Sequence, residues 1–157
     1  APPYPVSSNG FMQLWLSSSG SPATDFSNAP LVGSGPANMI APFWDDLTTI
    51  SGGGTGVRVA TVGMGIDRRF VVGWNNWAAV DASGTNLTFQ VKLFETTGAI
   101  EFHYCTLDFG TALNSGRVAG NSATVGVQNA TRDAGIALSH NTASISAQLG
   151  VRLTPRP

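Results

Sequence analysis

Charge is scarce in this sequence. Only 11% of its 157 residues are Asp, Glu, Lys or Arg, less than half of the usual share, and Lys92 is the one lysine. The formal net charge is −1, so the chain as a whole has no electrostatic attraction to a nucleic acid or an anionic membrane. We therefore expect neither a nucleic acid partner nor insertion into a membrane.

Cysteine and long apolar runs are also scarce. Cys105 is the single cysteine, which excludes a disulfide and a cysteine-based zinc site within the chain. Its position in an apolar strand predicts a buried free thiol, with pairing between chains as the alternative. No run approaches the roughly 18 consecutive apolar residues that a membrane helix requires.

Ser, Thr, Asn and Gly take the place of charged residues. Together with the shortage of lysine, they favour an extracellular or cell-surface location. No signal peptide is recognisable, and the opening Ala1-Pro2-Pro3 is compatible with a mature N-terminus left by a protease.

No stretch has a convincing helical period, whereas several short stretches alternate between apolar and polar residues. The most regular feature is a hairpin in which a strand over 85–95 returns over 99–105. Further strands are predicted over 11–16, 57–62, 68–76, 123–129, 135–139 and 150–154. Asn9-Gly10 is expected to form a bulge or a short corner before the first strand.

This pattern predicts an all-β fold, an antiparallel, jelly-roll-like β-sandwich. The expected organisation is a single domain over 6–157, preceded by a short arm over 1–5. Residues 17–37 form a long polar connection without a period, of a kind that is often functional.

Several stretches together resemble one known family. They read V-S-S-N-G-F (6–11), I-A-P-F-W-D-D-L (40–47), R-R-F-V-V-G-W-N-N (68–76), L-T-F-Q-V-K-L-F-E-T-T-G-A-I-E-F-H-Y (87–104), S-A-T-V-G-V-Q-N (122–129) and G-V-R-L-T-P (150–155). In order and spacing they are similar to the nidogen-like (NIDO-like) β-sandwich modules of bacterial secreted and cell-surface proteins. The resemblance implies extracellular recognition or adhesion, and it implies no catalytic residues.

The resemblance also implies that strands are missing at the N-terminus. Such modules usually carry about 25 to 35 further residues before V-S-S-N-G, which form a first pair of strands. Either this domain is trimmed or another chain supplies the missing strand, because an open sheet edge is a template for pairing. The preceding residues are therefore candidates for self-association, as an arm that its prolines keep extended: Ala1, Pro2, Pro3, Tyr4 and Pro5.

Two clusters are candidate binding sites. Asp45 and Asp46 supply the carboxylate oxygens that calcium prefers, and calcium is the only cofactor considered. Their alternative role is to accept backbone N–H groups in a turn. Trp77, with Asn75 and Asn76, combines a ring that stacks on sugars with amides that bond hydroxyl groups. The alternative for Trp77 is a place in the core.

Other residues complete the set of alternatives. A calcium site at Asp45 and Asp46 would need a further ligand, for which Asp67, Asp81 and Asp108 are candidates. His103 and Cys105 are the parts of a nucleophilic dyad, but cross-strand packing is the preferred interpretation because neither an oxyanion hole nor a third group is indicated.

The sequence thus favours a non-enzymatic extracellular module for adhesion, recognition or surface assembly. Its partners would be another protein chain, copies of itself or a glycan. One alternative is a structural subunit of an extracellular fibre that assembles by strand donation. Another is an accessory domain of a secreted hydrolase.

Overall fold

A computed structural model describes residues 4–14, 25–52, 54–82, 84–110 and 117–156. These residues form an all-β fold, which confirms the predicted class. The strands are β1 (Val6–Ser7), β2 (Phe11–Gln13), β3 (Met39–Trp44), β4 (Leu47–Thr49), β5 (Gly56–Val62), β6 (Arg69–Ala79), β7 (Asn86–Phe94), β8 (Ile100–Asp108), β9 (Thr124–Gln128), β10 (Gly135–His140) and β11 (Gly150–Leu153). Among the described residues, the short 3-10 helices η1 (Gly65–Asp67) and η3 (Val118–Gly120) lie in connections.

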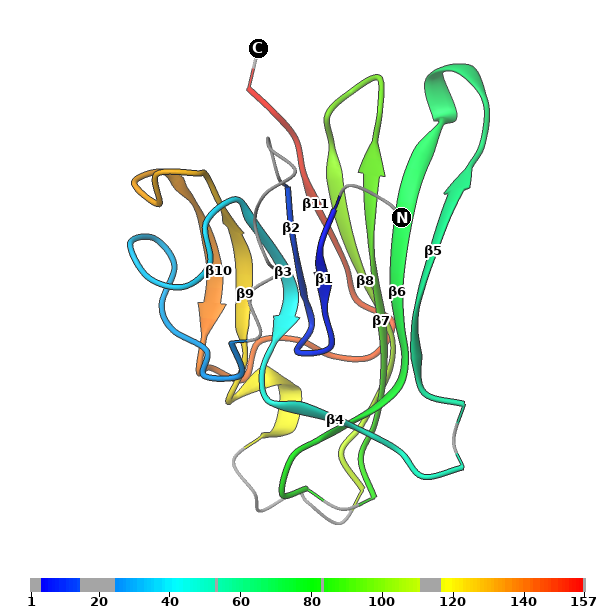
Figure 1. The fold of residues 1–157 in the computed structure, drawn as a ribbon, viewed down its shortest axis with the longest axis vertical. Helices are drawn as coiled ribbons and strands as arrows, with labels where there is room; N and C mark the ends of the chain where they lie inside the picture. Colours follow the sequence, from blue (N-terminus) through cyan, green and yellow to red (C-terminus); the bar gives the residue numbers. More distant parts are fainter. Residues whose placement is uncertain (1–3, 15–24, 53, 83, 111–116, 157) are drawn as a thin grey trace.

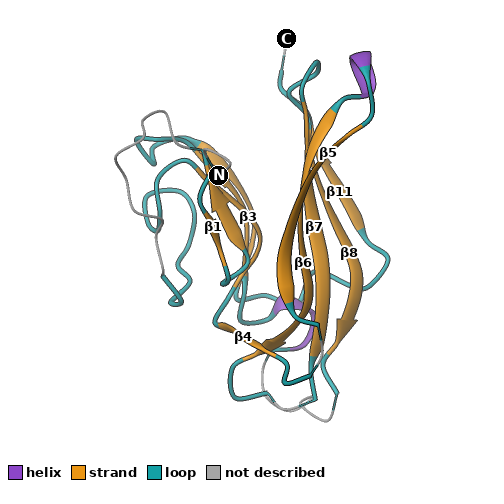
Figure 2. Ribbon diagram, turned by 45° about the vertical axis from the view of Figure 1, so that its right-hand side comes forward, coloured by secondary structure: helices purple, strands orange, loops and turns teal. Residues whose placement is uncertain are grey.

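The strands form two antiparallel sheets (Figure 1). Sheet A has the order β1-β2-β3-β9-β10, and sheet B has the order β11-β8-β7-β6-β4, with β5 also paired to β6. The sheets face each other as two layers that diverge toward the end where β5 turns into β6 (Figure 2). At the opposite end β4 crosses from one layer to the other (Figure 1). The fold is therefore a β-sandwich that is closed at one end and wide at the other.

The main core fills the space between the layers. In the predicted hairpin the inward positions are buried, namely Leu87, Phe89 and Val91 on β7 and Phe102 and Tyr104 on β8. Burial of large apolar side chains along alternate positions is what fixes the register, since a slip by one residue would turn them to the solvent.

One feature of the N-terminal half differs from the expectation. Asn9 and Gly10 close a hairpin between β1 and β2 instead of preceding a single strand. Gly10 adopts a φ of 75°, and a Cβ there would lie 1.8 Å from the Phe43 carbonyl oxygen. Pro42 lies inside β3, at a register shift between Ala41 and Trp44 where the pairing with β9 is irregular, as expected for a residue without an N–H.

A second apolar cluster covers the outer face of sheet A. It contains Phe11, Leu31, Met39, Ala41 and Trp44. The connection before β3 lies over this cluster, because the Trp44 indole N–H donates to the carbonyl oxygen of Asp25 over 3.0 Å. The outer face of sheet A is therefore covered, whereas no segment of the described residues covers the outer face of sheet B.

The hairpin at Gly10 gives a first testable prediction. Gly10→Ala should lower the free energy of unfolding by about 3 kcal/mol, because it combines a left-handed backbone with a clash against the Phe43 carbonyl. Gly84→Ala is the control: its φ is 81° but a Cβ meets no atom within 4 Å, so it should lose only about 1–2 kcal/mol. Urea denaturation of both variants checks this, and equal losses would contradict it.

Candidate functional site

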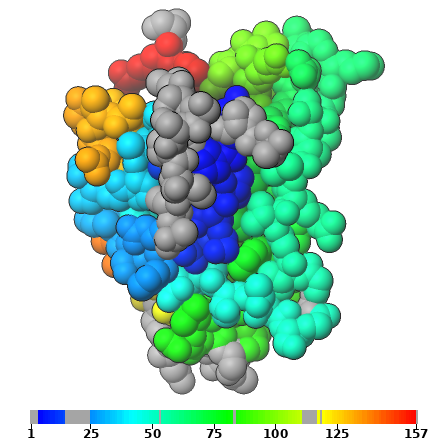
Figure 3. Space-filling model, in the orientation of Figure 1, coloured from blue at the N-terminus to red at the C-terminus, as the bar shows by residue number. Residues whose placement is uncertain are grey.

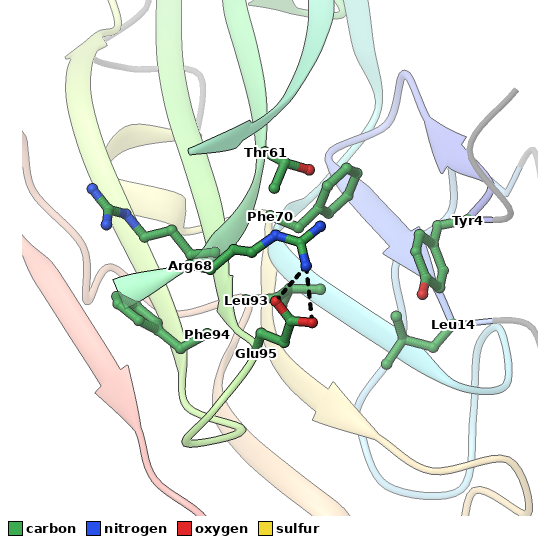
Figure 4. Close-up of a pocket in the computed structure, with 9 residues that line it drawn as sticks. Tyr4, Leu14, Thr61, Arg68, Phe70, Leu93, Phe94 and Glu95 are labelled. Atoms are coloured by element: carbon green, nitrogen blue, oxygen red, sulfur yellow. Dashed lines mark hydrogen bonds and ion pairs between the residues drawn. The ribbon is translucent and has the colours of Figure 1, made fainter. Parts of the chain in front are cut away.

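A groove opens between the layers at the wide end of the sandwich. It has a volume of about 420 Å³, and its apolar lining comes from both sheets. Tyr4 and Leu14 extend from sheet A toward Phe70 and Leu93 of sheet B (Figure 4). The rings of Tyr4 and Phe70 meet with their centroids 5.8 Å apart. An extended apolar segment fits such a lining better than a charged one.

The mouth of this groove is polar. Arg68 donates to both carboxylate oxygens of Glu95, over 3.2 and 3.0 Å, and this ion pair lies on the sheet B side (Figure 4). A second hollow of about 350 Å³ shares Leu14 and continues between Ile100 and Val127. The wide end of the sandwich thus leaves apolar side chains of both layers accessible.

The two sheets are offset sideways. β5 pairs with β6 in a register that places Val57, Val59 and Thr61 on the same face as the core residues of β6. This inner face of β5 is not covered by sheet A, and Val59 is 45% exposed. Figure 3 shows the green surface of β5 and β6 extending sideways beyond the blue N-terminal strands. Sheet B therefore overhangs sheet A at this edge.

The opposite edge carries the reverse overhang. β10 is the last strand of sheet A, and Ile136 is paired with Val127, so its side chain faces the space between the layers. Ile136 is nevertheless 44% exposed. An apolar side chain on the inner face is thus left uncovered at each edge, Val59 on sheet B and Ile136 on sheet A.

The free edge of β1 offers backbone groups for pairing. Gln13 donates its N–H to the Pro5 carbonyl over 3.0 Å, so residues 5 and 13 are a hydrogen-bonded pair. Because such pairs alternate along an antiparallel ladder, Val6 and Met12 are a non-hydrogen-bonded pair. The Val6 N–H and C=O consequently point away from β2, toward the free edge.

The predicted N-terminal arm is only partly visible. Ala1, Pro2 and Pro3 lie outside the described residues. Tyr4 packs on Phe70 and Pro5 extends the β1–β2 ladder, so both contact their own domain. Self-association through the arm stays a prediction.

Asp45 is a buried carboxylate that ties β3 to the segment before β9. One oxygen accepts from the Asp46 N–H and from Arg117 Nη1, each over 2.8 Å, and the other accepts from Ser122 Oγ over 2.5 Å. Burial raises the pKa of Asp45, while the Ser122 hydrogen bond and the Arg117 charge oppose that rise. The alternative in which an Asp accepts a backbone N–H is confirmed for Asp45.

Calcium binding by the Asp pair stays a prediction. Asp46 lies beside Asp45 in a polar hollow. The described residues contain no group of three or more His, Cys, Asp or Glu side chains that could hold a metal ion, so Asp67, Asp81 and Asp108 do not complete the site. A calcium ion would compete with the Arg117 guanidinium for the Asp45 carboxylate.

Trp77 does not present its ring to the solvent. It is 7% exposed and belongs to the main core, so the expectation of an exposed stacking platform is wrong. The reason is a bulge in the β6–β7 pairing between Trp74 and Trp77, which turns the indole inward. Asn75 and Asn76 occupy this bulge, and both are half-buried.

Glu101, His103 and Cys105 lie on the outer face of sheet B. His103 Nε2 and Glu101 are 2.8 Å apart, and Arg152 Nη1 donates to the other Glu101 oxygen. Although burial raises the pKa of Glu101, the hydrogen bonds from His103 and Arg152 outweigh it and lower that pKa. Cys105 is exposed, so the prediction of a buried thiol is wrong: the apolar strand has one uncovered face.

Sequence reasoning missed the overhanging residues. Alternation places Val57 and Val59 on one face of a strand, but it does not show where the opposite layer ends. The signal available was the apolar, uncharged character of β10, where an edge strand usually carries a charge.

Fold and site together define an antiparallel β-sandwich module with two offset layers and accessible edges. A family model described as NIDO related matches residues 3–154 of the chain. The chain therefore belongs to the NIDO-related family, which confirms the resemblance and supports an extracellular type of module. No curated protein and no solved structure matches the chain. Within the described residues, no helix is long and apolar enough to cross a membrane.

The Asp45–Arg117 pair gives a second prediction. Arg117→Met should cost about 2 kcal/mol at pH 7, because it leaves a buried carboxylate without its cation. The loss should shrink as the pH falls toward 4, since a protonated Asp45 needs no counter-charge. The control Arg132→Met, at an exposed residue, should lose little stability. Urea denaturation of both variants at pH 7 and pH 4 checks this. A loss for Arg117→Met that does not depend on pH would contradict the account.

Glu101, whose pKa is shifted in the opposite direction to that of Asp45, gives a third prediction. A carboxyl with a lowered pKa stabilises the folded state above its ordinary pKa of 4.5, and this contribution is lost as the pH falls through the folded-state value. Glu101→Gln should therefore cost about 1 kcal/mol at pH 7 and almost nothing near pH 3. Glu95→Gln, which removes the more exposed pair with Arg68, should cost less. A Glu101→Gln loss that persists in acid would refute this account.

Proposed function

We propose that the chain is a non-enzymatic module of an extracellular protein that associates edge to edge with further copies of itself. The observation that carries the proposal is the sideways offset of the two sheets. It leaves Val59 uncovered at one edge and Ile136 at the other. Both side chains lie on inner faces, so each suits a partner that continues the sandwich.

A neighbouring copy fits this edge through its β10. Placed beside β1, that strand would continue sheet A and lie over the inner face of β5. Ile136 of the neighbour would then cover Val59, and both apolar side chains would be removed from water. The outward N–H and C=O of Val6 would gain partners in the new ladder.

One movement extends both sheets. Within sheet A, four antiparallel steps separate β1 from β10, so the two strands run in the same direction. In sheet B, four antiparallel steps likewise separate β5 from β11, so these two strands also run in the same direction. A copy translated sideways therefore brings β10 beside β1 and β11 beside β5 together. Such a head-to-tail contact does not close on itself, so it repeats into a filament.

The edges of sheet A carry few of the devices that prevent pairing. Natural edge strands are commonly protected by Lys, Pro or inward-pointing charges. Neither β1 nor β10 contains Asp, Glu, Lys, Arg or Pro. β10 has a bulge between Ala137 and Ser139, which leaves its first part, with Ile136, regular. This composition supports association through these edges.

A proline at Val6 tests the backbone part of the proposal. Val6→Pro removes the outward N–H but no bond to β2, so it should abolish association while the domain stays folded. Val6→Ala is the matched control, since it loses the same packing but keeps the N–H. Sedimentation velocity at increasing protein concentration measures the mass. The mass of the wild-type protein and of Val6→Ala should increase with protein concentration. Val6→Pro should stay monomeric.

Ile136→Lys tests the other edge. A charge over Val59 should prevent association, whereas Val32→Lys, at an exposed apolar residue of the connection on the outer side of sheet A, should leave it unchanged. Circular dichroism and thermal melting establish that each variant is folded. A wild-type chain that stays monomeric at every concentration, or an Ile136→Lys variant that associates normally, would overturn the proposal.

A further inference from the structure

Among the described residues no segment covers the outer face of sheet B, and this face is rich in cations. Strand register places its outward side chains in rows across five strands. Toward the wide end these rows contain Arg58, Arg69, Lys92, Arg152, Phe94 and His103.

Charge is distributed very unevenly over the molecule. This face carries four of the eight basic residues of the chain and two of its nine acidic residues, Glu101 and Asp108, of which Asp108 lies at the far end of β8 from the cations. The whole chain has a net charge of −1. With four basic and two acidic residues, this face has a formal charge of +2, and the remainder of the chain has a formal charge of −3. The near-neutral total thus conceals a local cationic surface.

The cations of this face are held against the sheet. The guanidinium carbons of Arg152 and Arg69 lie 4.9 and 5.8 Å from the centroid of the Phe94 ring. Arg152 is also paired with Glu101. In contrast, neither Arg58 nor Lys92 has an acidic partner within 4.0 Å among the described residues. Two cations therefore remain available to an anionic ligand.

We infer that this face binds an extended anionic polysaccharide. Cations suit its carboxylate groups, and the neighbouring Gln90 and His103 suit its hydroxyl groups, since both side chains form hydrogen bonds without a fixed charge. The outward rows run across five strands, so a chain can contact several strands at once.

Two other polyanions fit this face less well. A lipid surface would favour a protruding aromatic side chain, whereas Phe94 lies under guanidinium groups. A nucleic acid duplex is usually read by an element that enters a groove, and among the described residues this face consists of strands with no protruding helix. Both remain as competing outcomes of the test.

This inference is independent of the proposed function. Edge-to-edge association uses β1, β5, β10 and β11, and leaves the outer face of sheet B open. In a filament the cationic faces of successive copies would form one continuous strip, which would strengthen the binding of a long polymer.

Binding of polygalacturonate to the full chain tests the inference. It should bind at low salt and be released above physiological salt, because the contacts are ionic, while neutral dextran should not bind. The double variant Arg58→Gln/Lys92→Gln should weaken binding about fivefold, as expected for two exposed ionic contacts. The matched control Arg132→Gln/Arg156→Gln removes the same charge elsewhere and should bind like the wild type.

Each outcome decides the question. Equal weakening in both double variants would show an effect of net charge alone and overturn the assignment of the face. Failure to bind polygalacturonate, or tighter binding to duplex DNA or to phosphatidylglycerol vesicles, would overturn the ligand class. Because Arg58 lies on β5, which the proposed association also uses, the proposed function is tested separately by the association state of the wild-type chain and of Val6→Pro, in which this face is unaltered.

Discussion

One buried hydrogen bond fixes the sideways position of the two layers. The Trp74 indole of sheet B donates to the Ser7 carbonyl of sheet A over 2.8 Å, and so sets β1 above β6. A second bond between the layers, from the Tyr104 hydroxyl to the Pro42 carbonyl over 2.6 Å, prevents rotation about the first. Burial raises the pKa of Tyr104, so this donor stays protonated. With β1 held above β6, β5 necessarily lies beyond the edge of sheet A.

Two features explain which surfaces are accessible to a partner: the sideways offset of the two sheets, and the segment that covers the outer face of sheet A. Sheet A is covered on its outer side by the connection that Trp44 anchors, so its accessible groups are at its edges. In the part of the chain that the structure describes, no layer covers the outer side of sheet B, and its accessible surface is a broad face. An apolar edge suits a second copy of the same fold, and a cationic face suits a polymer of opposite charge. Two kinds of contact are thereby separated on one small domain.

Much of the fold could be predicted from the sequence, because alternation reports which residues share a face. It located the hairpin over 85–95 and 99–105, in which the structure buries Phe89 and Val91. It could not show that Cys105 is exposed, since the period does not tell which face another layer covers. Trp77 was misjudged because a bulge reverses the alternation locally, and the short strand β4 has no period to detect. The accessible edges depend on the packing of one sheet against the other, which no local pattern records.

Disulfide cross-linking between copies tests the central claim most directly. Val59→Cys and Ile136→Cys are made separately in a Cys105→Ser background and then mixed under mild oxidation. If a neighbour's β10 lies over β5, the mixture should yield a covalent dimer that joins the two variants, while each variant alone should yield far less. No mixed dimer, or equal dimerisation of each variant alone, would contradict edge-to-edge association through the offset layers.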